Sequence, residues 1–126
     1  MRGQRAQAAV EFGLTVGLLM LVVVMTTQVA IYLHYRTTLD LVTREGAYAG
    51  SLVNTGPADA MRTSRQLWAE IEPGGGPIQV TATRDGNLMV VTASVSAPAL
   101  VPAPVPPFAA WPVTSRSVHT IEVFTP

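Results

Sequence analysis

One carboxylate stands at the head of the longest apolar stretch in the sequence. Glu11 immediately precedes Phe12–Leu33, a run of 22 residues without a charge. A charged side chain at the centre of a bilayer costs about 2.5–3.5 kcal/mol, and less near the interface. Glu11 therefore has two available states. It can lie solvated among lipid headgroups, or it can pair with a cation, such as a neighbouring subunit's N-terminal amine, once the helix leaves lipid.

The other reactive side chains do not form a recognisable active site. His34 lies beside the end of the apolar run and His119 lies in an expected strand, while the chain has no cysteine for a thiolate, a disulfide or a soft metal site. The serines lack the base and orienting group of a nucleophilic triad, and the acidic residues lack metal-ligand spacing. These residues are Ser94, Ser96, Ser115, Ser117, Asp59, Glu70, Glu72 and Asp85. We expect no enzymatic activity, no cofactor and no small-molecule substrate.

Length and charge narrow the class of protein further. A chain of 126 residues has room for one membrane helix and one small domain. Its eight basic residues, all arginine, balance eight acidic residues to a net charge of zero. A neutral chain lacks the excess of cations that drives binding to phosphate backbones, so we expect no nucleic-acid partner.

The apolar run has the length and composition of a membrane-spanning helix. Twelve of its 22 residues are Leu, Ile, Val or Phe, which contribute roughly −4 to −7 kcal/mol toward insertion. As a helix it is about 33 Å long, enough to cross a hydrocarbon core of about 30 Å. Arg2 and Arg5 precede it and favour a cytoplasmic N-terminus with an exported C-terminal part. The alternatives are a buried helix of a soluble core or a cleaved secretory signal ending near Ala47-Tyr48-Ala49.

The helical pattern continues beyond the apolar run. Apolar or small residues recur at alternating steps of three and four, at Tyr32, Tyr35, Leu39, Val42, Gly46, Ala49 and Val53. This spacing predicts one helix over 7–53, about 70 Å long, following a leader over 1–6. Residues 12–33 would be embedded in the membrane and residues 34–53 exported, unless the helix breaks at Thr37-Thr38.

Small residues suggest where this helix meets other backbones. Gly13 and Gly17 form a G-x-x-x-G pattern in the apolar run, which is a weak signal for helix packing in membranes. Gly46 and Ala49 lie on the stripe of the exported half and would also permit close approach.

The remaining chain, 54–126, predicts a small α+β domain. Asn54–Pro57 reads as a helix stop, and a second helix follows over Pro57–Ile71 with Thr55 or Asn54 as its cap. Residues 77–97 predict a hairpin with Asp85 and Gly86 at the centre of its turn, which places Ala82 opposite Met89.

A proline-rich connection leads to the last expected strand. Six of the 15 residues in 98–112 are proline, so this segment should be an extended loop, with Phe108 and Trp111 as its anchors. A third strand is expected over Ser115–Thr125, with Ile121 and Val123 on one side. The predicted fold class is α+β: a long membrane-spanning spine helix, a short second helix and a small antiparallel sheet on the exported half.

Two blocks of sequence resemble a known family. Gln7-Ala8-Ala9-Val10-Glu11-Phe12 before a long apolar run resembles the class III signal of type IV prepilins. Thr43-Arg44-Glu45-Gly46-Ala47-Tyr48-Ala49 is similar to the AREGAR-type stretch that follows the apolar helix in TadE/TadG-like minor pilins (pseudopilins) of Tad/Flp pilus systems. The resemblance covers about the first 50 residues and implies a pilin-like architecture.

The resemblance also implies a route of processing and assembly. A prepilin peptidase would cut between Ala6 and Gln7, with Ala6 standing where the family usually has Gly, so that Glu11 becomes the fifth mature residue and, with Phe12, serves assembly. The implied partners are the bacterial inner membrane, platform proteins driven by a cytoplasmic ATPase, and other pilins. The implied function is surface adhesion. A permanently membrane-anchored envelope protein with a small exported binding domain is the alternative.

Overall fold

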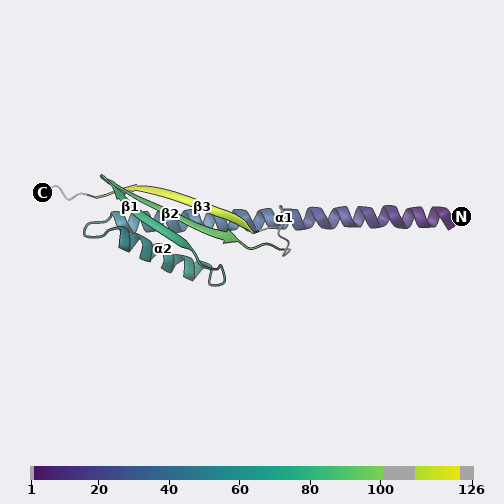
Figure 1. The fold of residues 1–126 in the computed structure, drawn as a ribbon, viewed down its shortest axis with the longest axis horizontal. Helices are drawn as coiled ribbons and strands as arrows, with labels where there is room; N and C mark the ends of the chain where they lie inside the picture. The colour runs from purple at the N-terminus through teal and green to yellow at the C-terminus, as the bar shows by residue number, and fades with distance from the viewer. Residues whose placement is uncertain (1, 101–109, 123–126) are drawn as a thin grey trace.

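The computed structural model describes residues 2–100 and 110–122, which form two helices and three strands. In chain order these are α1 (Arg2–Ser51), α2 (Pro57–Ile71), β1 (Gln79–Asp85), β2 (Leu88–Ala97) and β3 (Trp111–Thr120). Figure 1 shows α1 running the length of the molecule, with α2 and the sheet gathered along its C-terminal half. The expected α+β fold with a long first helix, a short second helix and an antiparallel sheet is confirmed.

Helix α1 is continuous for 50 residues, about 75 Å, and has no break at Thr37-Thr38. No proline occurs before Pro57, so nothing removes a backbone donor from its interior. The threonine hydroxyls of the apolar half donate to the carbonyls four residues earlier, each at 2.8 Å, in Thr15, Thr26 and Thr27. These bonds satisfy the hydroxyls within the helix itself, so the helix can face an apolar environment there.

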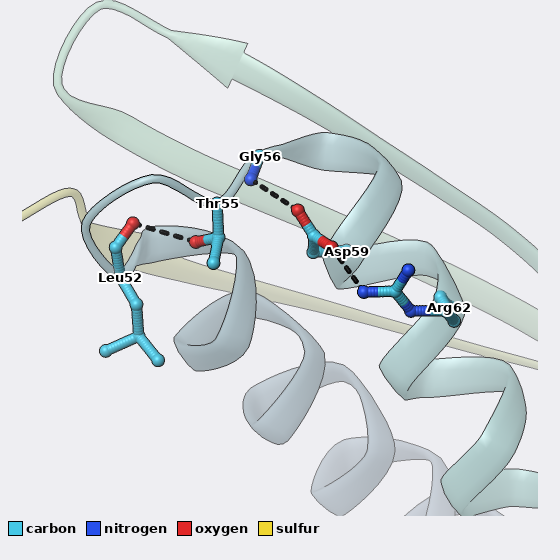
Figure 2. A network of polar contacts seen from close by, with 5 residues as sticks. All are labelled: Leu52, Thr55, Gly56, Asp59 and Arg62. Carbon is cyan, nitrogen blue, oxygen red and sulfur yellow. Dashed lines mark hydrogen bonds and ion pairs between the residues drawn. The ribbon is translucent and has the colours of Figure 1, made fainter.

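The turn between the helices is built differently from the expected cap. Helix α2 has the predicted bounds, but its N-cap is Gly56, and the Asp59 carboxylate accepts the Gly56 N–H at 3.0 Å. Thr55 instead donates its hydroxyl to the Leu52 carbonyl at 2.7 Å and so satisfies the end of α1 (Figure 2). Arg62 pairs with the second oxygen of Asp59.

Asp59→Ala should destabilise the domain formed by α2, the sheet and the C-terminal half of α1 by about 0.5–2 kcal/mol, the usual cost of a lost helix cap. Asp59→Asn keeps an acceptor for the Gly56 N–H and loses mainly an exposed ion pair, which is worth little. Thermal unfolding of the two variants in detergent checks this order. Equal losses would show that the charge, and not the capping bond, matters.

The sheet has the order β1-β2-β3 with antiparallel pairs. The hairpin is confirmed, but its predicted register was wrong: Ala82 pairs with Val91 rather than Met89. The turn is centred on Gly86 and Asn87, and Gly86 has φ +58°, as the first central residue of a type II′ turn requires. The pairing slips by two residues along β2, so the same side chains still face the core.

Strand β3 begins at Trp111, four residues before the expected start at Ser115, and ends at Thr120. Pro112 is accommodated because β3 is an edge strand, where a missing N–H costs no ladder bond. Ile121 follows the strand and is buried, with its N–H donating to the Asn87 carbonyl at 2.8 Å. The expected positions of Phe108 and Val123 lie outside the described residues.

The core lies between the inner face of the sheet, α2 and the C-terminal half of α1. Its most completely buried large side chains come from α1, β2 and β3: Leu39, Val42, Met89, Val91 and Val113. Trp68 of α2 closes the core and donates its indole N–H to the Gly76 carbonyl at 3.2 Å. The core therefore fixes the domain to α1 and leaves the N-terminal half of that helix projecting alone (Figure 1).

Candidate functional site

The N-terminal half of α1 has no partner within the described chain. Every residue from Arg2 to Val23 is exposed, and none of the most apolar window of the helix is buried. By length and composition this helix can cross a membrane. An exposed apolar surface of this extent marks contact with lipid or with other protein.

Glu11 lies on this exposed surface without a cation. The Gln7 side-chain amide donates to a Glu11 carboxylate oxygen at 3.1 Å. In residues 2–100 and 110–122 the ion pairs are His34 with Glu72 and Arg62 with Asp59, so the charge of Glu11 is not neutralised there. A neutral amide does not replace a counter-ion in a medium of low dielectric. Ala6 and Gln7, at the expected cut, lie one turn earlier on the same exposed helix.

The expected packing residues fall into two groups. A Cβ added at Gly13 or Gly17 would meet nothing within 4 Å, so both residues present open surface. Gly46 faces α2, where an added Cβ would lie 1.9 Å from Ser64 Oγ and 3.0 Å from the Ala60 carbonyl oxygen. Ala49 is half-buried.

Gly50 is a contact that the sequence analysis missed. An added Cβ there would lie 2.6 Å from the Ala60 Cβ. Its spacing of four from Gly46 was the available signal, because residues four apart lie on one helix face.

Gly46→Ala should destabilise the domain by about 1–3 kcal/mol, since the new methyl group overpacks the contact between α1 and α2. Gly17→Ala is the matched control: it adds the same methyl group in open space and should be neutral or stabilising by helix propensity. Urea unfolding of both variants in detergent measures the difference. A Gly46→Ala variant as stable as Gly17→Ala would contradict the close packing.

Two pairs of aromatic rings lie at the end of the domain nearest the bare half of α1, by which we mean its exposed N-terminal half. The Tyr32 and Trp111 rings meet edge to face with centroids 5.4 Å apart, and the Tyr35 and Trp68 rings do so at 5.7 Å. Burial raises the pKa of Tyr35, and the nearby Glu72 carboxylate raises it further. Tyr35 therefore stays neutral well above neutral pH, which suits its place in the core.

The candidate nucleophilic serines of β3 are part of a polar contact with α1. Thr43 Oγ1 lies 3.1 Å from Ser115 Oγ and 3.0 Å from Ser117 Oγ, and Ser115 donates to the Asp40 carboxylate. His119 lies next to Ser51 of α1, at 3.2 Å, and not next to either of these serines. Among the described residues no group of three or more His, Asp or Glu could hold a metal ion. This arrangement packs an edge strand against a helix through polar side chains.

Gln28 is a second residue that the sequence analysis did not single out. It is 2% exposed, although it lies within the apolar run. Its side-chain amide donates to the Pro98 carbonyl at 3.0 Å, and its carbonyl oxygen accepts the Leu100 N–H at 2.9 Å. The available signal in the sequence for these hydrogen bonds was a polar side chain within an apolar run.

Comparison with protein families gives one partial match. The family model described as TadE-like protein matches residues 6–47, one third of the chain, from the expected cut through the apolar run into the C-terminal half of α1. The resemblance to TadE-like proteins is thereby confirmed, and that family is related to Tad pili. No curated protein and no solved structure matches the chain.

Proposed function

We propose that this chain, whose residues 6–47 match TadE-like proteins, is a minor pilin-like (pseudopilin) structural subunit in the assembly of a Tad/Flp-type pilus. The observation that carries the proposal is the division of α1 into a bare apolar half and a half built into a folded domain. A subunit that is stored in a membrane and later joins a helical filament needs one surface that serves both lipid and neighbouring helices.

The bare half of α1 is the part that moves from lipid to contact with neighbouring helices during assembly. In the bacterial inner membrane it spans the bilayer once, with the N-terminus cytoplasmic and the domain exported. Because α1 is continuous, a pull on the exported domain is transmitted directly to the membrane segment. A prepilin peptidase and platform proteins driven by a cytoplasmic ATPase are the partners this route requires.

Glu11 provides the chemistry of assembly. Cleavage after Ala6 leaves Gln7 with a free amine, and Glu11 pairs with the amine of a neighbouring pilin. The attraction strengthens among packed helices, because the effective dielectric there is lower than in water. Phe12 and the open surfaces at Gly13 and Gly17 lie beside this pair and accept neighbouring helices. We propose that the resulting pilus functions in surface adhesion.

Shearing of surface filaments tests the proposal. In cells with the assembly ATPase, the chain should appear in the sheared fraction together with other pilins. In cells without the ATPase, it should be confined to the inner membrane. Retention in the membrane in both strains would instead favour a permanently anchored envelope protein.

A further inference from the structure

Gln28 places part of the exported domain at a level expected to lie within lipid. It lies five residues before Leu33, the end of the uncharged run, which is about 7.5 Å along the helix axis. Its neighbours Thr27 and Val29 are exposed, whereas Gln28 is buried and hydrogen-bonded to the backbone of Pro98 and Leu100. That irregular segment therefore sits beside α1 at the depth of Gln28.

The bonds of Gln28 are those that such a segment needs in an apolar medium. Lipid offers no hydrogen bonds, so backbone outside helices and strands survives there only when protein satisfies its polar groups. Gln28 satisfies the Pro98 carbonyl and the Leu100 N–H with one side chain. Pro98 itself brings no N–H donor.

The side chains at this end of the domain match a membrane interface. Leu100 is 45% exposed, and no charged residue occurs between Pro98 and Pro112. Trp111 packs on Tyr32, about 6 Å above Gln28 along α1, and Trp and Tyr concentrate at the headgroup level of membranes. Arg36 is the first charged residue of α1 after the apolar run, and it lies one turn beyond Tyr32, further from the membrane centre.

We propose that the membrane-proximal end of the domain, formed by Pro98–Leu100 and Trp111, inserts into the exported-side leaflet of the phospholipid bilayer beside α1. Figure 1 shows the end of β2 and the start of β3 at the end of the domain that faces the bare half of α1. The proposal rests on the proposed function in one respect, namely that α1 spans a membrane. It adds a second lipid contact, which the chain withdraws when the subunit leaves the bilayer.

Quenching of tryptophan fluorescence by brominated phospholipids tests this insertion in the full chain. The Trp68→Phe variant, with Trp111 as its emitter, is reconstituted in phosphatidylethanolamine and phosphatidylglycerol vesicles with brominated acyl chains. We expect loss of most of its emission. The Trp111→Phe variant retains Trp68, which is 3% exposed in the core, and should lose little. Unquenched Trp111 would overturn the proposal.

A positive control separates failure of this proposal from failure of the proposed function. Leu21→Trp, in a background with both native tryptophans changed to Phe, reports on the apolar half of α1. If it is quenched while Trp111 is not, the helix spans the membrane and the domain stays above it. If it is not quenched, the membrane-spanning helix and the proposed function fall together.

Thiol labelling gives a second measurement that does not alter the aromatic contacts. Because the chain has no cysteine, Leu100→Cys and Thr114→Cys each introduce a single thiol. Thr114 is exposed on the outer face of β3. In vesicles, a membrane-impermeant maleimide should label the Thr114→Cys variant and fail to label the Leu100→Cys variant. Equal labelling would contradict insertion.

Discussion

Glu11→Ala should insert into the inner membrane as well as the wild type does and should be absent from sheared filaments. Removing the carboxylate lowers the cost of insertion, since a charge near lipid costs up to about 2.5–3.5 kcal/mol. The same change leaves a neighbouring N-terminal amine without its counter-ion among packed helices, where an unpaired charge is far more costly. Fractionation of membranes and sheared filaments measures both effects in one culture.

Two further variants isolate the charge at Glu11. Glu11→Gln keeps the size and hydrogen bonding of the side chain and should fail to assemble in the same way. Glu70→Ala removes an exposed carboxylate from α2 and should assemble normally. Filament entry by Glu11→Ala at the wild-type level would show that the carboxylate has no part in assembly.

Trp68→Ala should destabilise the folded domain by about 3–5 kcal/mol, the range for removing a buried aromatic side chain. The indole fills the space between α2 and α1, meets the Tyr35 ring and satisfies the Gly76 carbonyl. Its removal leaves a cavity and an unpaired carbonyl at once. A loss of this size is a large fraction of the stability of an ordinary small domain.

Urea unfolding in detergent, followed by circular dichroism, measures the effect of Trp68→Ala. Trp68→Phe is the control: it keeps most of the apolar contact but loses the bond to Gly76, so its loss should be much smaller. The apolar half of α1 should keep its helical signal in both variants, because no contact of Trp68 reaches it. A loss below about 1 kcal/mol for Trp68→Ala would contradict the assigned core.

Strong periodicity made the helices predictable from the sequence. The stripe that includes Tyr35, Leu39 and Val42 is buried against α2 and the sheet, so the continuation of α1 beyond the apolar run followed from spacing alone. The bounds of α2 followed from Pro57 at its start and Pro73 soon after its end. Helical spacing and proline positions can be read from the sequence alone, without knowledge of tertiary contacts.

The errors arose where a local signal had two solutions. Asp85-Gly86 and Gly86-Asn87 are both good two-residue turns, and both registers keep the same face buried, so the hydrophobic pattern could not distinguish them. The early start of β3 depended on its edge position, which alone makes Pro112 acceptable. The role of Gln28 depended on a segment 70 residues away.

The candidate site was visible in the sequence because a single charge beside a long apolar run is physically costly. Glu11 could therefore be identified without any fold. Its partner could not, because Glu11 forms no ion pair within the described residues and the proposed amine belongs to another subunit. The neighbours proposed for Gly13 and Gly17 likewise belong to other subunits, and within the described chain both residues present open surface.

The N-terminus of the mature protein tests most directly whether cleavage frees the amine that pairs with Glu11. Intact mass and N-terminal sequencing of the protein purified from its own membrane should give a chain that begins at Gln7, with Glu11 as its fifth residue. A chain that still begins at Met1 or Arg2 would contradict the pairing of Glu11 with a freed amine. A chain that begins at Gly50 would show that α1 is a removed signal and that the exported domain acts without it.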